Sequence, residues 1–160
     1  MNIKIACQQD IDSIWKIFRE VVKTGDTYVF DPNISKEEAI KNWLGEKYYT
    51  YVAEVDGEIL GTYIVKQNQP GLGSHIANAS YMVHPNAHGK GIGKAMAKHS
   101  IEEAKKLGFH AMQFNIVIAT NTPAIKLWEK FGFKIIGTVP EAFQHMSQGL
   151  VDAHIMYLKL

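Results

Sequence analysis

The chain has 160 residues, of which 46% are hydrophobic and 21% are charged. A chain of this length is expected to form one domain that buries about two thirds of the surface of its unfolded form. The formal net charge of +1 gives no general electrostatic attraction to nucleic acid or to an anionic membrane surface. We therefore expect a single domain over residues 1–160 whose partner is a small molecule.

The cysteine count and the apolar pattern favour a reducing compartment. Cys7 is the only cysteine, so an internal disulfide cannot form. The amino terminus lacks the basic start and long apolar stretch of a secretion signal, and no apolar run approaches the ~20 residues of a membrane span. We expect a cytoplasmic protein without a membrane segment.

The first part of the chain predicts a short edge strand and two helices. Residues 2–6 suit the strand, and Asp10 is the expected N-cap of an amphipathic helix that ends at Gly25. Ser35 and Glu38 have the spacing of a capping box, in which each residue binds a backbone N–H near the helix start. A second helix is therefore expected to begin at Ser35.

The middle of the chain predicts three strands. Residues 48–55 alternate in polarity, and Asp56-Gly57 is a strong signal for a hairpin turn, so a returning strand is expected over about residues 58–66. A polar, glycine-bearing stretch follows, and residues 75–84 suit a central strand.

Residues 79–98, ASYMVHPNAHGKGIGKAMAK, combine the end of this strand with a glycine-rich loop and a helix start. Gly89, Gly91 and Gly93 allow the backbone to come close to a ligand, and the helix presents unpaired N–H groups and the positive end of its dipole. Such a site binds anions. The spacing matches neither the Walker loop nor the dinucleotide fingerprint G-x-G-x-x-G.

The last part of the chain predicts two further helices and three strands. The expected elements are a helix over 92–107, a strand over 110–118 parallel to the strand before the loop, a helix capped by Thr122, and strands over 133–139 and 153–160.

Two segments resemble the GNAT acetyltransferase superfamily. His88 to Gly93, HGKGIG, matches the acetyl-CoA loop Gln/Arg-x-x-Gly-x-Gly/Ala except at its first residue. Asn121 to Phe133, NTPAIKLWEKFGF, resembles the second signature of the family. The expected order of elements is also that of the family. The resemblance implies an α/β (α+β) GNAT fold: a mixed, mostly antiparallel sheet of seven strands with a splayed parallel pair, flanked by about four helices.

The resemblance further implies acetyl-CoA as co-substrate and direct transfer of the acetyl group to an amine. In the family, the pantetheine arm pairs with strand backbone where the parallel pair separates, and the glycine loop surrounds the pyrophosphate. The cofactor-binding residues implied in this chain are Met82, Val83, His88, Gly89, Lys90, Gly91, Ile92, Gly93, Lys94 and Asn121. For Lys90 and Lys94 a role as solvated charges is the alternative, and Asn121 could instead be only a turn residue. Members of the family are often dimers, so a homodimer is an open alternative.

One position departs from the family. The tyrosine that often protonates the departing sulfur is replaced by Trp128, which has no proton to give. A thiol pKa near ~8.5 makes the thiolate a tolerable leaving group, so water or a neighbouring hydroxyl could suffice. The sequence leaves the general acid and the general base open.

Asn78 and Asn115 are the candidate residues for the acceptor, because an asparagine within an apolar strand needs hydrogen-bond partners. A bond to neighbouring backbone is the alternative for each. A narrower similarity to fungal acetyltransferases of proline analogues, such as azetidine-2-carboxylate, implies that both hold the carboxylate or amine of a small amino acid. The loop over residues 25–32 is either a surface connection or a wall of the acceptor pocket.

Tyr81 and His75 are candidate proton relays to the amine. For His75, His84 and His110, each at a strand end, a solvated or core-edge role is the alternative. No histidine pair has metal-ligand spacing on one helix face, so no metal is predicted.

The leading interpretation is an acetyl-CoA-dependent N-acetyltransferase of a small-molecule amine, with an amino acid or analogue as one candidate. Two alternatives stay open: a GNAT-fold module that binds acetyl-CoA without turnover, and an enzyme that acetylates a protein or peptide amine.

Overall fold

The structure is a computed structural model that describes residues 1–160. Its strands are β1 (Asn2–Ile5), β2 (Tyr49–Val55), β3 (Glu58–Gln67), β4 (Ile76–Val83), β5 (Ala111–Ile118), β6 (Lys134–His145) and β7 (Gly149–Lys159). Its helices are α1 (Ile11–Val22), α2 (Lys36–Trp43), α3 (Ile92–Lys106) and α4 (Thr122–Lys130), with short 3-10 turns at Gln8–Asp10, Gly71–Gly73 and Pro85–Ala87. None of the helices is long and apolar enough to cross a membrane.

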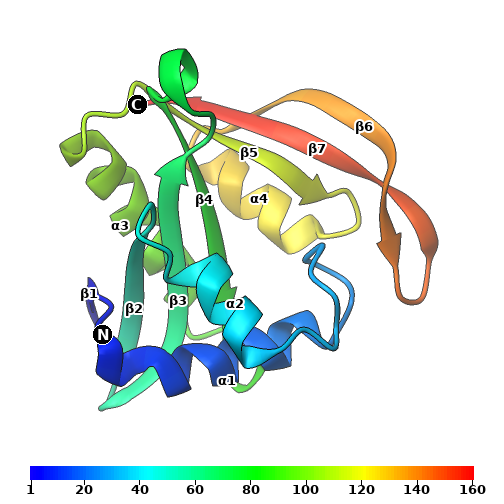
Figure 1. The fold of residues 1–160 in the computed structure, drawn as a ribbon. Coiled ribbons are helices and arrows are strands. Elements are labelled where there is room, and N and C mark those ends of the chain that lie inside the picture. Colours follow the sequence, from blue (N-terminus) through cyan, green and yellow to red (C-terminus); the bar gives the residue numbers. More distant parts are fainter.

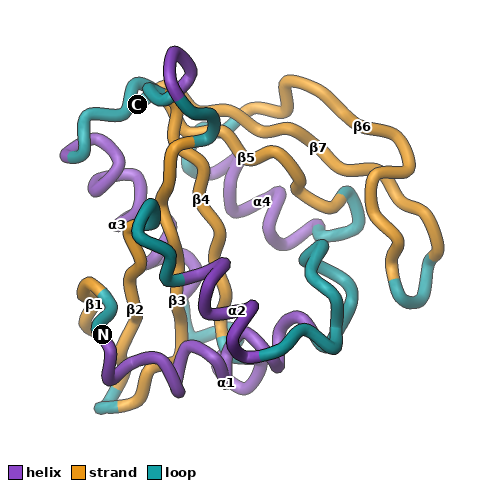
Figure 2. Tube along the Cα trace, viewed as in Figure 1, coloured by secondary structure: helices purple, strands orange, loops and turns teal.

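The strands form one seven-stranded sheet in the order β1-β2-β3-β4-β5-β7-β6 (Figures 1 and 2). Every neighbouring pair is antiparallel except β4 and β5, which run parallel and are joined through α3. A mixed sheet with one parallel pair and four helices is the fold class that the sequence predicts, and the prediction is confirmed.

The parallel pair separates soon after it begins. β4 and β5 pair only at Ile76 with Ala111 and at Ala77 with Met112. Beyond these residues the two strands diverge, as Figure 1 shows. The register between β5 and β7 shifts between Phe114 and Val117, which places a bulge in β5 on the diverging part. The sheet is therefore split between β4 and β5.

Two hydrophobic clusters cover the faces of the sheet. Nine buried residues, Met82 among them, pack with α1 and α2 on one face. A cluster of eighteen buried residues packs with α3 and α4 on the other face. Figure 1 shows α1 and α2 in front of the sheet and α3 and α4 behind it. Side chains alternate along a strand, so Asn78 lies on the same face as Met82.

The helix N-caps lie at the predicted residue in two of three cases. Ser35 is the N-cap of α2, since its hydroxyl accepts from the Glu38 N–H at 3.2 Å, and this prediction is confirmed. Asp10 is the N-cap residue of α1, as predicted, but its side chain does not cap this helix, because its carboxylate accepts from the Cys7 N–H at the start of the preceding 3-10 turn at 2.9 Å. The cap of α4 is Asn121 rather than Thr122, since the Asn121 side chain accepts from the Ala124 N–H at 3.3 Å.

The last two strands are longer than predicted. β6 and β7 form a hairpin whose register shifts between Val139 and Phe143, and Glu141 within this shift has a left-handed φ of 52°. The irregularity interrupts the alternating pattern, which is why the sequence predicts only the outer parts of both strands. The hairpin tip contacts the loop between α1 and α2, where the Met146 N–H donates to the Gly25 carbonyl at 3.1 Å.

Candidate active site

A cavity of about 1070 Å³ occupies the split between β4 and β5. Its lining combines the loop after α1, the diverging parts of β4 and β5, the glycine loop, the start of α3 and one side of α4. The cavity therefore connects the predicted anion site with the strands that carry Asn78 and Asn115.

The glycine loop forms one end of the cavity. Gly89 and Gly91 have left-handed φ values of 80° and 76°, and no atom lies within 4 Å of a Cβ built at either position. Gly91 is the N-cap of α3, so the N–H groups of the first helical turn lack intrahelical partners. Lys94 also lines this end, whereas Lys90 is exposed outside the lining. This end suits a diphosphate, because free N–H groups and open space for an approaching ligand coincide.

The exposed edge of β4 forms the middle of the cavity. Peptide groups alternate between the two sides of a strand, and His84 N–H and Ile76 C=O both pair with the β3 side. The peptide groups of Tyr81 and Val83 consequently face the split, while those of Met82 face β3. This corrects the expectation for Met82, which has only its buried side chain to offer the cavity.

The peptide of Tyr81 already has a partner, which the sequence did not reveal. The Tyr28 hydroxyl accepts from the Tyr81 N–H at 2.9 Å and donates to the Tyr81 C=O at 2.6 Å. Burial raises the pKa of Tyr28, so its phenol stays protonated. Tyr28 and Phe30 line the cavity, which means that the loop after α1 forms part of its wall.

The side chain of Tyr81 points away from the acceptor candidates. Its hydroxyl bonds to the Ser100 hydroxyl on α3 at 2.7 Å, and its ring lies 4.8 Å from that of Trp128. Burial raises the pKa of Tyr81 as well. Since Asn78 lies on the opposite face of the sheet, the structure does not bring the Tyr81 hydroxyl to the predicted acceptor position. Trp128 is buried and forms an aromatic wall of the cavity with Phe114.

Four amide side chains form a cluster where the strands separate. Asn68, which follows β3, accepts through Oδ1 from Asn78 Nδ2 at 3.2 Å and from Asn115 Nδ2 at 2.8 Å. Gln113 Nε2 donates to Asn115 Oδ1 at 3.0 Å. The structure thus brings together the two predicted asparagines through a third. No local signal in the sequence distinguishes Asn68 from a loop residue.

The structure does not bring His75 into the site. His75 is exposed just before β4, its ring lies 6.2 Å from that of His110, and it does not line the cavity. A proton relay through His75 is therefore not supported by its position. Asn121 lines the cavity, but its side-chain oxygen already caps α4.

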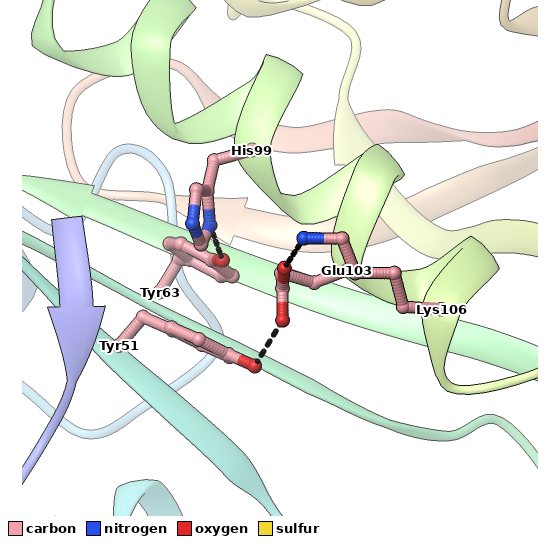
Figure 3. Close-up of polar contacts among 5 residues, drawn as sticks. All are labelled: Tyr51, Tyr63, His99, Glu103 and Lys106. Carbon is pink, nitrogen blue, oxygen red and sulfur yellow. Dashed lines mark hydrogen bonds and ion pairs between the residues drawn. The ribbon is translucent and has the colours of Figure 1, made fainter.

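A separate polar cluster fixes α3 on the sheet (Figure 3). The Tyr63 hydroxyl bonds to His99 Nδ1 at 2.5 Å, the Tyr51 hydroxyl donates to Glu103 at 2.9 Å, and Lys106 donates to Glu103 at 2.7 Å. The Lys106 hydrogen bond holds the pKa of Glu103 below its usual value, and burial raises the pKa of Tyr51 to about 12. These residues lie outside the cavity lining and anchor the helix whose other end carries the glycine loop.

Comparison with known proteins agrees with this geometry. The chain is similar to N-acetyltransferase aca1 of Schizosaccharomyces pombe, with 39% identity over 61% of this chain and 47% of that protein. The chain thus spans less than half of that relative. It is also similar to the L-amino acid N-acyltransferase MnaT of Escherichia coli, with 26% identity over 100% of this chain and 94% of MnaT.

A solved structure and a family model cover most of the chain. The GCN5-related N-acetyltransferase from Kribbella flavida superposes with a TM-score of 0.94 and 42% identity over 99% of this chain and 97% of that one. Residues 11–133 match the model of the acetyltransferase (GNAT) family, and this match includes the glycine loop, both diverging strands and α4. The protein belongs to the acetyltransferase (GNAT) family.

Proposed function

We propose that this protein transfers an acetyl group from acetyl-CoA to the amine of a small molecule, with an amino acid or an analogue as acceptor. The observation that carries the proposal is the cavity itself. It connects a helix start suited to a diphosphate with an amide cluster suited to a small polar acceptor.

The residues along the cavity fit acetyl-CoA. Gly89 and Gly91 leave open the space that a Cβ would occupy, and Val83 presents backbone groups to the split. In this proposal the loop from His88 to Lys94 holds the pyrophosphate, and the β4 edge holds the arm as an added strand. Acetyl-CoA, when bound, supplies the thioester that donates the acetyl group. Once the Tyr28 hydroxyl is displaced, the Tyr81 N–H is the backbone donor suited to polarise a carbonyl oxygen in the split.

The acceptor end supports a small amine. Asn78, Asn115 and the wall formed by Tyr28 and Phe30 enclose this part of the cavity on the α1–α2 face of the sheet. Asp26 is the only carboxylate in the lining, so the site attracts an amine mainly through hydrogen bonds. The attacking amine must be neutral, and a lining with few charges favours loss of its proton. The name of the relative MnaT, an L-amino acid N-acyltransferase, supports the same class of acceptor.

The test is the release of free thiol from acetyl-CoA with a panel of amino acids, their amides, polyamines and short peptides. The proposal expects release that depends on the amine, with the highest kcat/KM for a free amino acid or analogue. Asn115→Ala should lower kcat/KM for that acceptor, and the exposed edge-strand variant Asn2→Ala is the matched control.

The same panel separates the two other candidate functions. Trp128 in place of the usual tyrosine favours a module that binds acetyl-CoA without turnover, and such a module would release thiol at a rate independent of every amine. An enzyme that acts on protein amines would prefer peptides over free amino acids. Either result would overturn the proposed acceptor class.

A further inference from the structure

Asn68 does not line the cavity, yet it connects the two strands that do. It follows β3, where its N–H donates to the Ile76 carbonyl at 2.8 Å, so its backbone is fixed beside the start of β4. Its side chain reaches Asn78 on β4 and Asn115 on β5. These two strands have no backbone pairing at the level of these asparagines. Asn68 is therefore a side-chain bridge across the opening of the split.

The hydrogen bonds determine which atoms the bridge leaves available. An asparagine amide has one carbonyl oxygen that accepts and one NH₂ group that donates. Because Asn68 Oδ1 accepts from both neighbours, the NH₂ groups of Asn78 and Asn115 point toward Asn68. The Asn115 oxygen is occupied by Gln113. Of the two predicted acceptor residues, only Asn78 has a carbonyl oxygen without a partner in the protein.

This oxygen is accessible from the cavity. Asn78 is 9% exposed and lines the cavity, yet no side-chain N or O atom in the protein is both fully buried and without a hydrogen-bond partner. The Asn78 oxygen therefore keeps contact with the cavity space. A carbonyl oxygen there accepts hydrogen bonds from an amine or an ammonium group and repels a carboxylate.

We propose that Asn68 is a positioning residue that turns the Asn78 carbonyl oxygen toward the N–H groups of the acceptor. The inference rests on the proposed function and assigns Asn78 to the amine of the acceptor rather than to its carboxylate. Without Asn68, both neighbouring amides lose the acceptor that orients them, and Asn78 can rotate to present NH₂ instead. The bulge in β5 explains why this bridge is needed, since Asn115 lies where the register of β5 shifts and β4 no longer pairs with it.

Two variants of Asn68 test the orientation. Asn68→Ala removes the shared acceptor and is expected to raise KM for the amine about tenfold, which corresponds to one lost hydrogen bond of about 1.4 kcal/mol. The Kd of acetyl-CoA by calorimetry should stay within about twofold of wild type, because the glycine loop is untouched. Asn68→Asp keeps an accepting oxygen at the same place, so its KM for the amine should stay close to that of wild type. Gln69→Ala, an exposed neighbour outside the bridge, is the matched control.

A substitution of Asn78 tests which atom the amine contacts. Asn78→Asp keeps an oxygen and removes NH₂, so KM for the amine should not rise by more than about twofold, whereas Asn78→Leu should raise it about tenfold. Equal losses in both variants would overturn the assignment of the amine to the Asn78 oxygen. If Asn68→Ala does not fold, Asn78→Asp and Asn78→Leu still test which atom of Asn78 contacts the amine.

The outcomes separate this inference from the proposed function. If wild-type protein releases thiol without dependence on any amine, the proposed function is wrong and the inference is wrong with it. If wild type is active and Asn68→Ala has an unchanged KM, only the inference is wrong. A loss of acetyl-CoA affinity as large as the change in KM would indicate general loosening of the split, which also overturns a positioning role.

Discussion

Replacement of Gly91 by alanine separates the effect of the glycine loop on fold stability from its effect on acetyl-CoA binding. Gly91 has a φ of 76° at the N-cap of α3, where an added Cβ would meet no atom within 4 Å. The variant therefore introduces no clash inside the protein. It introduces backbone strain, and it places a methyl group in the open space where the diphosphate would lie.

Gly108 offers the matched control because it lies directly after the same helix. Its φ is 82°, and a Cβ there also meets no atom within 4 Å. An L-residue in the left-handed region costs about 1–2 kcal/mol, so Gly91→Ala and Gly108→Ala should destabilise the fold by similar amounts. For a protein of this size, each kcal/mol lowers Tm by about 2–4 °C. The two variants should melt within a few degrees of each other.

The two variants should differ in acetyl-CoA binding. Each hydrogen bond to a charged group contributes about 1.5–3 kcal/mol, so loss of one N–H contact at Gly91 should weaken binding about tenfold to a hundredfold. Gly108→Ala should bind as wild type does. Isothermal calorimetry gives Kd, and thermal melting measures the shared strain. An unchanged Kd for Gly91→Ala would refute the assignment of this loop to the diphosphate.

Two further predictions concern the Tyr28 hydroxyl and the Glu103 carboxylate. Tyr28→Phe leaves the Tyr81 peptide without its partner, so the free energy of unfolding should drop by about 1–3 kcal/mol. Calorimetry should show tighter acetyl-CoA binding, because no hydroxyl must be displaced from the Tyr81 peptide. Unchanged stability and affinity would contradict this reasoning. The Lys106 hydrogen bond lowers the pKa of Glu103 from its usual 4.5, so ionised Glu103 stabilises the fold above that value, and this contribution disappears as pH drops through the lower folded pKa. Tm measured between about pH 6 and 3 should therefore decline less in Glu103→Gln than in wild type, and parallel curves would show that Glu103 does not contribute.

The geometry of the glycine loop was predictable because it is encoded locally. Gly89 and Gly91 take the left-handed backbone that glycine favours, and α3 begins at the next residue. A few consecutive residues thus determine both the open space and the free N–H groups. Part of the sheet was predictable for a similar reason, since alternating polarity indicates β2 and the Asp56-Gly57 turn indicates the return into β3.

The amide cluster at the proposed acceptor end was only partly predictable because its contacts join distant segments. Asn78 and Asn115 were found as polar residues within apolar strands, but Asn68 is 47 positions from Asn115 and its sequence surroundings resemble a loop. Tyr28 and Tyr81 are 53 positions apart. Hydrogen bonds of this kind depend on how β3, β4 and the loop after α1 pack, which periodicity cannot specify.

Different contacts fix the two ends of the cavity that lies in the split between β4 and β5. The glycine loop begins α3, which the Tyr63–His99 contact holds on the sheet. The wall near Tyr28 belongs to a loop that two contacts hold: the Tyr28 hydroxyl binds the Tyr81 peptide of β4, and the Met146 N–H at the tip of the β6–β7 hairpin donates to the Gly25 carbonyl. We therefore expect a change at the hairpin tip to affect the wall near Tyr28 directly, through the Gly25 contact. Because Tyr81 binds Tyr28 through its peptide and Ser100 of α3 through its hydroxyl, the two ends of the cavity remain coupled through β4.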